Sequence, residues 1–489
     1  MTNKRWQRAL AAGVVLAGVA AACGSDSEEE AGGGTTTAKA AEGAAAGSGA
    51  AVNLPNTVVG ENPSTWGVKD KKLTGPGGFT IDLSKCPANW NDKAGITDTE
   101  IRLGASGILS GSAASASGYV LGAKAYFDHF NASEGGINGK KLVYEIKDSG
   151  YEAGRGKAGT DELIETGNIF SFVAHTGTPI ILATYDKLNE SCMPNVYGVG
   201  AHPAQADPVL HPWTTGTWLG YDAEANLWAD YILEKYGKGA TVAALAWAND
   251  YGTIYKNTFT KAAKDRGLNF VKVETHEGSA PTVQNEMTTL ASTNADVFII
   301  MTGAVYSIGA VQYLANSTYK PKERLTSSVN NVVSQYKAAG AGGDGWIHTG
   351  YAKDVNDPSV ANEPFAKQFR DILVKAGLDP TNPGQNGQSA MFAWPFVENL
   401  KRASQLPGGL SRTNLMLAIR SYSAQHPMVF DGIKFEMNGT KDPHPIEGAS
   451  FLKYTVPAGQ ETGSFVPIGK IVDQNGKNGP CQYDGKECK

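Results

Sequence analysis

The sequence predicts an α/β protein with two lobes, each built on a mostly parallel sheet flanked by helices and joined to the other by a hinge. Its 489 residues are 41% hydrophobic and 19% charged, which is too apolar for a disordered chain and too long for one compact core. Short apolar strands alternate with amphipathic helices over two long stretches, the pattern of parallel sheets with crossover helices. The 59 glycines predict many loops.

The elements of the first lobe begin after Thr97. Apolar runs and helical periodicity predict strands at 100–105, 141–147, 169–174 and 195–198, and helices at 118–129, 159–166 and 180–188. We assign residues 96–220 to lobe one.

A second succession begins at Asp222 and predicts the other lobe, residues 221–350. Its strands are expected at 241–247, 269–274 and 297–302, and its helices at 222–236, 255–266, 282–292 and 307–315. Helices at 363–376, 388–406 and 412–422 are expected to complete lobe one within residues 351–430. Residues 431–489, with strands at 432–436, 449–456 and 465–471, are expected to cross the hinge, complete lobe two and end in a disulfide tail.

The first 22 residues predict a secretory signal. Lys4, Arg5 and Arg8 precede an apolar run over 9–22, which is short for a membrane span. The small residues before Cys23 resemble a bacterial lipoprotein signal, in which that cysteine receives the lipid, although Ala20 stands where such signals usually carry leucine. Ordinary cleavage with a free thiol at Cys23 is the alternative.

Two segments separate Cys23 from the lobes. Residues 23–51 contain no large apolar side chain beyond the signal, so we expect a disordered, solvated tether. Residues 52–95 contain Trp66, Trp90 and Cys86 among several prolines, which predicts an irregular N-terminal extension that a disulfide holds against the lobes.

Five cysteines leave one without a partner in a secreted chain, and lipidation of Cys23 accounts for it. The other four permit three pairings. Cys481 with Cys488 is favoured because residues 483–485 can form a turn, which leaves Cys86 with Cys192. No paired Cys-x-x-Cys or histidine pair accompanies them, so no metal site is expected.

Several function classes are not supported by the residues. Without the first 22 residues the chain has 40 basic and 48 acidic residues, and it has no basic cluster for a nucleic-acid partner. The pattern G-x-G-x-x-G at 340–345 precedes a strand instead of following one, so no dinucleotide cofactor is expected. No nucleophile, phosphate-loop or zinc-protease motif occurs, so we expect no cofactor and no enzymatic activity.

Candidate binding residues follow the predicted strands, because ligands of open α/β sheets bind beyond the carboxyl ends of the strands. In each case an ordinary strand-to-helix turn is the alternative. The first lobe offers hydroxyls and backbone donors and the second offers aromatic and amide groups, so we expect a cleft for a small organic solute. The candidates are Ser110, Gly111, His175, Thr176, Thr178, Gly200, Ala201, Trp247, Tyr251, Tyr306 and Asn330.

Segments 101–104 (IRLG), 109–111 (LSG), 135–142 (GGINGKKL) and 250–252 (DYG) carry a family resemblance. On these residues, the chain from about 95 to 476 resembles the type I periplasmic binding proteins of ABC transporters, in particular the branched-chain-amino-acid-binding branch. The resemblance implies that Ser110, Thr178, Gly200 and Ala201 bind the carboxylate end of a ligand. It also implies that Tyr251 closes over the ligand from lobe two.

The implied function is an extracytoplasmic lipoprotein, a monomer anchored to the cell membrane, that closes on one small solute. It would deliver the solute to a membrane permease driven by a separate ATPase. Amino-acid-binding members usually supply an acidic residue from lobe two, yet no carboxylate lies between Arg324 and Asp344. An unpaired buried ammonium costs several kcal/mol, so an amide, an aromatic or hydroxylated acid or another small organic solute is expected.

Two other classes of function stay open from the sequence. The first is a ligand-sensing receptor module that signals to a membrane partner, against which the absence of a signalling segment argues. The second is a hydrolytic cell-wall enzyme, for which no catalytic constellation is found in the sequence.

Overall fold

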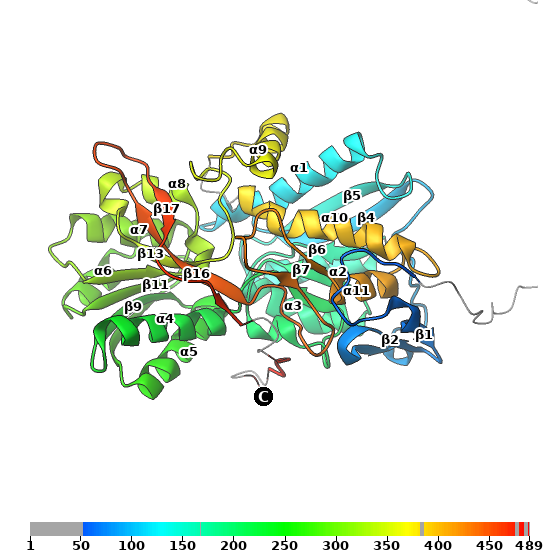
Figure 1. The fold of residues 1–489 in the computed structure, drawn as a ribbon, viewed down its shortest axis with the longest axis horizontal. Helices are drawn as coiled ribbons and strands as arrows, with labels where there is room; N and C mark the ends of the chain where they lie inside the picture. The colour runs from blue at the N-terminus through cyan, green and yellow to red at the C-terminus, as the bar shows by residue number, and fades with distance from the viewer. Residues whose placement is uncertain (1–51, 167, 382–385, 475–478, 484–487, 489) are drawn as a thin grey trace, which may run out of the picture. The chain divides into compact units, whose positions relative to one another are not determined.

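The computed structural model describes residues 52–166, 168–381, 386–474, 479–483 and Cys488. Residues Ala50–Lys489 form one compact unit. The predicted signal, Cys23 and the tether lie outside the described residues. Within the described part of the chain, two separate sheets flanked by helices confirm the α/β prediction (Figure 1).

Lobe one contains five parallel strands in the order β5-β4-β6-β7-β8. Its strands are β4 (Glu100–Gly107), β5 (Lys141–Asp148), β6 (Ser171–Val173), β7 (Asn195–Gly198) and β8 (Thr214–Gly216). Helices α1 (Gly118–Ser133), α2 (Ala153–Glu165) and α3 (Thr178–Glu190) connect them. The sequence does not predict β8, which is only three residues long, and it places the start of α2 six residues late because glycines lower the helix propensity of its first turns.

Three later helices return to lobe one, as the sequence predicts. They are α9 (Pro364–Lys375), α10 (Ala390–Gln405) and α11 (Arg412–Arg420). Helices α9 and α10 pack on α1, and α11 packs on α10.

Lobe two contains a mixed sheet in the order β10-β9-β11-β12-β13-β16-β17. Its first five strands are parallel: β9 (Thr241–Trp247), β10 (Asn269–His276), β11 (Val297–Met301), β12 (Glu323–Thr326) and β13 (Ile347–Gly350). Strand β16 (Gly448–Thr455) pairs antiparallel with β13, and β17 (Ser464–Pro467) and β18 (Val472–Asp473) pair antiparallel with β16. The central strands β9 and β11 are buried almost throughout, which explains their continuous apolar sequence.

Helices of lobe two connect and cover this sheet: α4 (Tyr221–Tyr236), α5 (Asp250–Arg266), α6 (Gln284–Ala291), α7 (Ala304–Asn316) and α8 (Val333–Lys337). The chain passes between the lobes after β8, after β13 and before β16. Two short strands, β14 (Ser423–Ala424) and β15 (Phe435–Glu436), pair antiparallel just before the last passage. None of the helices in the described residues is both long enough and apolar enough to span a bilayer.

The N-terminal extension is more regular than the sequence suggests. It contains an antiparallel sheet of β1 (Gly67–Lys69), β2 (Lys72–Thr74) and β3 (Thr80–Asp82), which corrects the expectation of an irregular segment. The strands are three residues each, too short to give a period-two pattern that can be recognised.

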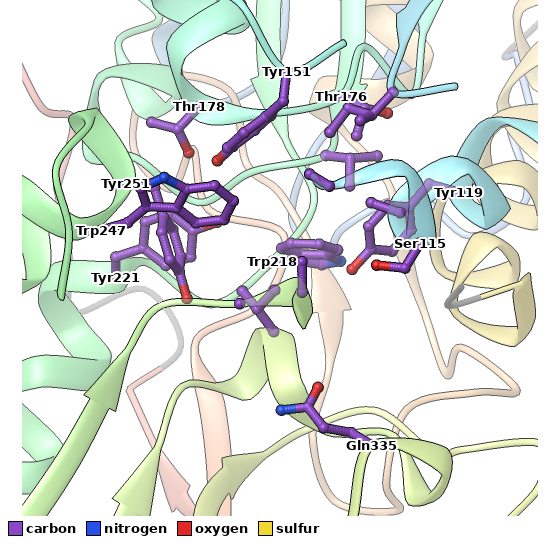
Figure 2. A pocket seen from close by; sticks show the side chains of 18 of the residues that line it. Ser115, Tyr119, Tyr151, Thr176, Thr178, Trp218, Tyr221, Trp247, Tyr251 and Gln335 are labelled. Carbon is purple, nitrogen blue, oxygen red and sulfur yellow. The ribbon is translucent and has the colours of Figure 1, made fainter. Parts of the chain in front are cut away.

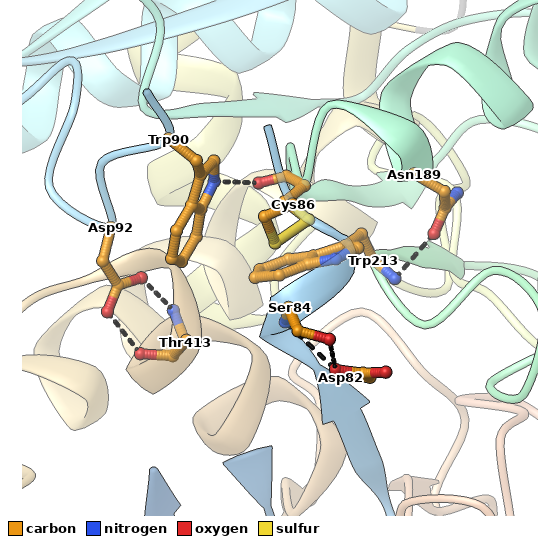
Figure 3. Close-up of a disulfide and its surroundings, with 9 residues drawn as sticks. Asp82, Ser84, Cys86, Trp90, Asp92, Asn189, Trp213 and Thr413 are labelled. Atoms are coloured by element: carbon orange, nitrogen blue, oxygen red, sulfur yellow. Dashed lines mark hydrogen bonds between the residues drawn. A yellow bond between two sulfur atoms is a disulfide. The ribbon is translucent and has the colours of Figure 1, made fainter. Parts of the chain in front are cut away.

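A disulfide and hydrogen bonds attach the extension to lobe one (Figure 3). Cys86 is bonded to Cys192 across 106 residues of sequence. The indole of Trp90 donates to the carbonyl of Cys192 at 2.9 Å, and Asp92 accepts from the backbone and hydroxyl of Thr413 at 2.9 and 2.6 Å. These contacts join the extension to both the first and the second part of lobe one.

The second disulfide joins Cys481 to Cys488. The backbone N–H of Cys481 donates to the carbonyl of Ala206 at 2.9 Å, and the ring of Tyr483 lies edge-on to His202 with centroids 4.6 Å apart. The end of the chain therefore contacts lobe one, although the preceding β18 belongs to the sheet of lobe two. Both disulfides are the pairings that the sequence favours.

Candidate functional site

A cavity lies between the two lobes, and both contribute to its lining (Figure 2). The space between the lining residues amounts to about 670 Å³, a figure that includes volume open to solvent. Lobe one supplies Ile108, Ala113, Ser115, Ala116, Tyr119, Tyr151, Thr176, Gly177, Thr178 and Val199. The first passage between the lobes and lobe two supply Trp218, Tyr221, Trp247, Tyr251, Gly303, Ala304, Ile308, Val329 and Gln335.

The carboxyl ends of the strands place most of these residues, as expected for parallel sheets. Gly177 and Thr178 begin α3 just after β6, and Gly303 and Ala304 begin α7 just after β11. Trp247 is the last residue of β9, and the side chain of Asn249 caps α5 by accepting from the N–H of Gly252 at 3.1 Å. The cap sets the start of α5 and so the position of Tyr251, the second residue of that helix.

Direct contacts join the lobes across the cavity. The ring of Tyr151 from lobe one lies 4.9 Å, centroid to centroid, from the indole of Trp247 in lobe two. The hydroxyl of Ser112 donates to the carbonyl of Gly278 at 2.8 Å. The cavity is therefore enclosed by lobes that already touch one another.

Two glycines permit the close packing at this contact. A Cβ on Gly177, whose φ is +103°, would lie 2.6 Å from the ring of Tyr151. A Cβ on Gly252 would lie 2.1 Å from the carbonyl oxygen of Trp247. Side chains at these positions would displace the two aromatic residues that meet between the lobes.

The lining carries no charged side chain: within the described residues, its polar groups are hydroxyls, two indole N–H groups, one amide and backbone. The buried carboxyl nearest in sequence to these residues is Glu224 of α4, which lies behind the lining. It accepts from the backbone N–H and the hydroxyl of Ser328 at 2.7 and 3.0 Å and from the hydroxyl of Tyr255. Burial raises the pKa of Glu224 to about 7. Its hydrogen bonds fix the loop after β12, next to Val329.

Four of the residues predicted from the sequence line the cavity: Thr176, Thr178, Trp247 and Tyr251. They lie at the carboxyl ends of β6 and β9 and at the starts of the helices that follow. Tyr251 is almost fully buried and lies edge-on to Tyr221 at 5.1 Å between centroids.

Other predicted residues of lobe one lie outside the lining. The hydroxyl of Ser110 donates to Asp148 at 2.6 Å, and Gly111 follows it in the same turn. His175 is fully buried, accepts from the N–H of Ser106 at 3.1 Å and contacts Thr184. Burial lowers the pKa of His175 to about 3, so its ring is neutral and structural.

Gly200 and Ala201 also lie behind the lining. The carbonyl of Ala201 accepts from the N–H of Tyr221 at 2.9 Å, which fixes the start of α4. In lobe two, Tyr306 packs against Trp247 with centroids 5.1 Å apart, and its hydroxyl donates to Gly278. Asn330 is fully buried, and its amide N–H₂ group donates to Thr302 and Thr326 at 2.8 Å.

Sequence reasoning missed several lining side chains. Tyr151 follows β5 by three residues, so the same strand-end argument applied to that loop would have found it. Trp218 follows the unpredicted strand β8, and Tyr221 begins the next helix. Ser115, Tyr119 and Gln335 come from helical segments that reach the cavity only through tertiary packing, and no local signal marks them. Within the described residues, no cluster of histidine, cysteine and carboxylate side chains has the arrangement of a metal site.

Comparisons with known proteins agree with this architecture. The periplasmic binding protein family matches residues 100–457. No match was found among curated protein sequences. A fatty acid ABC transporter substrate-binding protein from Thermomonospora curvata superimposes with a TM-score of 0.65 and 19% identity, over 83% of this chain and 98% of that one.

Two further solved structures have the same fold. A branched chain amino acid ABC transporter protein from Thermus thermophilus with bound valine has a TM-score of 0.67 and 17% identity, over 77% of this chain and 97% of that one. A solute binding protein of an ABC transporter from Rhodopseudomonas palustris HaA2, in complex with p-hydroxybenzoic acid, has a TM-score of 0.63 and 16% identity, over 77% and 98%. Given the match over most of its length, this chain belongs to the periplasmic binding protein family.

Proposed function

We propose that this protein captures a small organic solute in the cavity between its lobes and delivers it to a membrane permease driven by a separate ATPase. One observation carries the proposal: residues of both lobes line a single cavity, and Tyr151 and Trp247 meet across it. A ligand in this position contacts both lobes only when they are closed. Its binding therefore favours the closed state through differential affinity.

The solved relatives support the same role. Those from Thermus thermophilus and Rhodopseudomonas palustris are described with bound valine and p-hydroxybenzoic acid, and the one from Thermomonospora curvata is named for fatty acids. The ligands of the fold thus differ widely, so the chemistry of the cavity must define the solute. The described lining is suited to binding, and it contains no histidine, carboxylate, lysine or cysteine that would activate its hydroxyls for catalysis.

The proposal includes a membrane anchor. Residues 1–22 direct export and are removed, Cys23 is lipidated, and residues 23–51 tether the lobes to the membrane. Replacing Cys23 by serine is expected to move the protein from the membrane fraction to the soluble fraction, whereas Ser25→Ala leaves it in the membrane fraction. Equal partition of both variants would contradict the anchor.

Solute capture is tested by identifying, with mass spectrometry, the molecule that the native protein retains on purification, and then measuring its affinity by calorimetry. Trp247→Ala is expected to weaken that affinity at least about tenfold, because the residue lines the cavity and contacts Tyr151. Trp394→Ala is the matched control: this half-buried tryptophan of α10 packs on His426, with centroids 4.9 Å apart, outside the lining. Equal affinity of the two variants would contradict the placement of the site.

A further inference from the structure

The absence of charged side chains from the described lining restricts the class of solute that the cavity can bind. None of the described lining residues is acidic or basic, so a buried ammonium group would meet no counter-ion. Glu224 does not supply one, because its two oxygens already accept three hydrogen bonds, from Ser328 and Tyr255. A desolvated, unpaired ammonium is strongly unfavourable in such a site.

Helix ends from both lobes add positive potential. Helices α3 and α7 each have 13 residues, and neither has a side-chain cap at its first turn. Their first residues, Thr178 and Ala304, line the cavity from opposite lobes. Pro179, the second residue of α3, has no N–H, but the other N–H groups of these first turns and the helix dipoles favour acceptor oxygens of a ligand and disfavour cations.

A further acceptor, the side-chain oxygen of Asn330, lies behind the lining of lobe two. Its side-chain oxygen is buried and has no hydrogen-bond partner among the described residues. It lies 3.7 Å from the position that a Cβ on Gly303, a lining residue, would occupy. Because the amide N–H₂ group already donates to Thr302 and Thr326, the oxygen is the group left to pair with a donor such as a hydroxyl.

The shape of the cavity is set by aromatic rings. Figure 2 shows Tyr151, Trp247, Tyr251 and Tyr221 close together, with Trp218 between this group and Tyr119. The rings of Tyr119 and Trp218 lie 5.4 Å apart, and those of Tyr151 and Trp247 lie 4.9 Å apart. Tilted rings on several sides offer faces and edges to a planar ring. Hydroxyls and an amide at Ser115, Thr176, Thr178 and Gln335 complete the lining.

From these features together we infer that the solute is a small aromatic compound that bears hydroxyl or carbonyl oxygens and no ammonium group. The inference rests on the proposed function, because it names the ligand class of the same cavity. It departs from an α-amino acid in one definite respect: the described lining offers the ammonium group no counter-ion, while it offers the ring several aromatic side chains.

Matched pairs of compounds that differ only in the ammonium group test the inference. The pairs are 3-phenylpropionate with L-phenylalanine, 3-(4-hydroxyphenyl)propionate with L-tyrosine, and 4-methylpentanoate with L-leucine, together with 4-hydroxybenzyl alcohol as a neutral phenol. Calorimetry on the full chain, freed of retained solute, is expected to show binding of one or more aromatic compounds without the amino group. Each such compound should bind at least about tenfold more tightly than its amino-acid partner.

A carboxylate introduced into the lining should favour ligands that carry an ammonium group. Val329→Asp places a carboxylate in the lining of lobe two, so it is expected to shift the preference within an aromatic pair toward the amino acid by about tenfold or more. Val305→Asp is the control, because this residue is exposed on α7 and lies outside the lining. Circular dichroism and the unfolding midpoint establish that each variant folds. If Val329→Asp does not fold, the affinities of the matched pairs for the unsubstituted protein are sufficient to test the proposed ligand class.

The outcomes separate the inference from the function on which it rests. Tighter binding of the amino acids, or binding of aliphatic compounds alone, overturns the aromatic, ammonium-free class and leaves solute capture standing. The class is also overturned if no compound of the panel binds while the native protein retains an aliphatic or ammonium-bearing solute that Trp247→Ala releases. If the native protein retains nothing and neither the panel nor a broad metabolite set binds, the proposed function fails as well.

Discussion

The buried carboxyl of Glu224 is expected to make folding stability depend on pH. Its pKa in the folded protein is about 7, against a reference value of 4.5, because burial disfavours the charged form. Between these values the folded protein keeps a proton that the unfolded chain releases. The stabilisation is therefore fully present below about pH 4.5 and is lost as the pH rises through about 7.

The magnitude follows from the shift. A difference of about 2.5 pH units, at about 1.36 kcal/mol per unit, corresponds to roughly 3 kcal/mol of unfolding free energy. In Glu224→Gln the amide takes the place of the protonated carboxyl. The amide can still accept from the N–H of Ser328, and its N–H₂ group can donate to the hydroxyl of Tyr255. The variant should therefore lack this part of the pH dependence.

The assay is urea unfolding followed by tryptophan fluorescence, with the disulfides kept oxidised, at intervals from pH 4.5 to 8. The quantity to compare is the difference in unfolding free energy between Glu224→Gln and the unsubstituted protein, because other titrating groups cancel in it. This difference should change by roughly 3 kcal/mol in favour of the variant as the pH rises. Glu234→Gln, at an exposed position of the same helix, controls for the loss of one charge. A difference that stays constant across the range would refute the assignment of a protonated, buried carboxyl.

Two further predictions concern the extension and the contact between the lobes. Replacing Cys86 and Cys192 by serine opens a loop that spans 106 residues of sequence and is expected to lower the unfolding free energy by about 5 kcal/mol. Solute affinity should stay unchanged in the folded fraction, since the disulfide lies outside the cavity lining, and a large loss of affinity would contradict this. Gly177→Ala is expected to weaken solute binding, because its Cβ would lie 2.6 Å from the ring of Tyr151. Gly377→Ala has a similar positive φ and no atom within 4 Å, so it should lower stability alone, and equal affinities in calorimetry would refute the role of that contact.

Local patterns were sufficient for most elements of the fold. Strand β9 matches its predicted range, and β7 does as well, because buried strands of parallel sheets are short, apolar and bounded by turn residues. The family resemblance, carried by short motifs such as GGINGKKL at 135–142, is confirmed over residues 100–457. The three-residue strands of the extension and β8 were not predicted, because three residues are too few to show the two-residue alternation of a β-strand.

The sequence by itself determined the two α/β successions, the favoured pairing of the cysteines and the edge of each sheet at which the cavity lies. These features depend on neighbours along the chain or on a general property of parallel strands. Only the tertiary structure decided which side chains at those edges face the cavity. Ser110 and His175 stand in suitable loops but bond to Asp148 and Ser106, whereas Tyr119 and Gln335 reach the cavity from helical segments. The direction of a side chain at such an edge depends on contacts between residues far apart in sequence, and no local pattern encodes it.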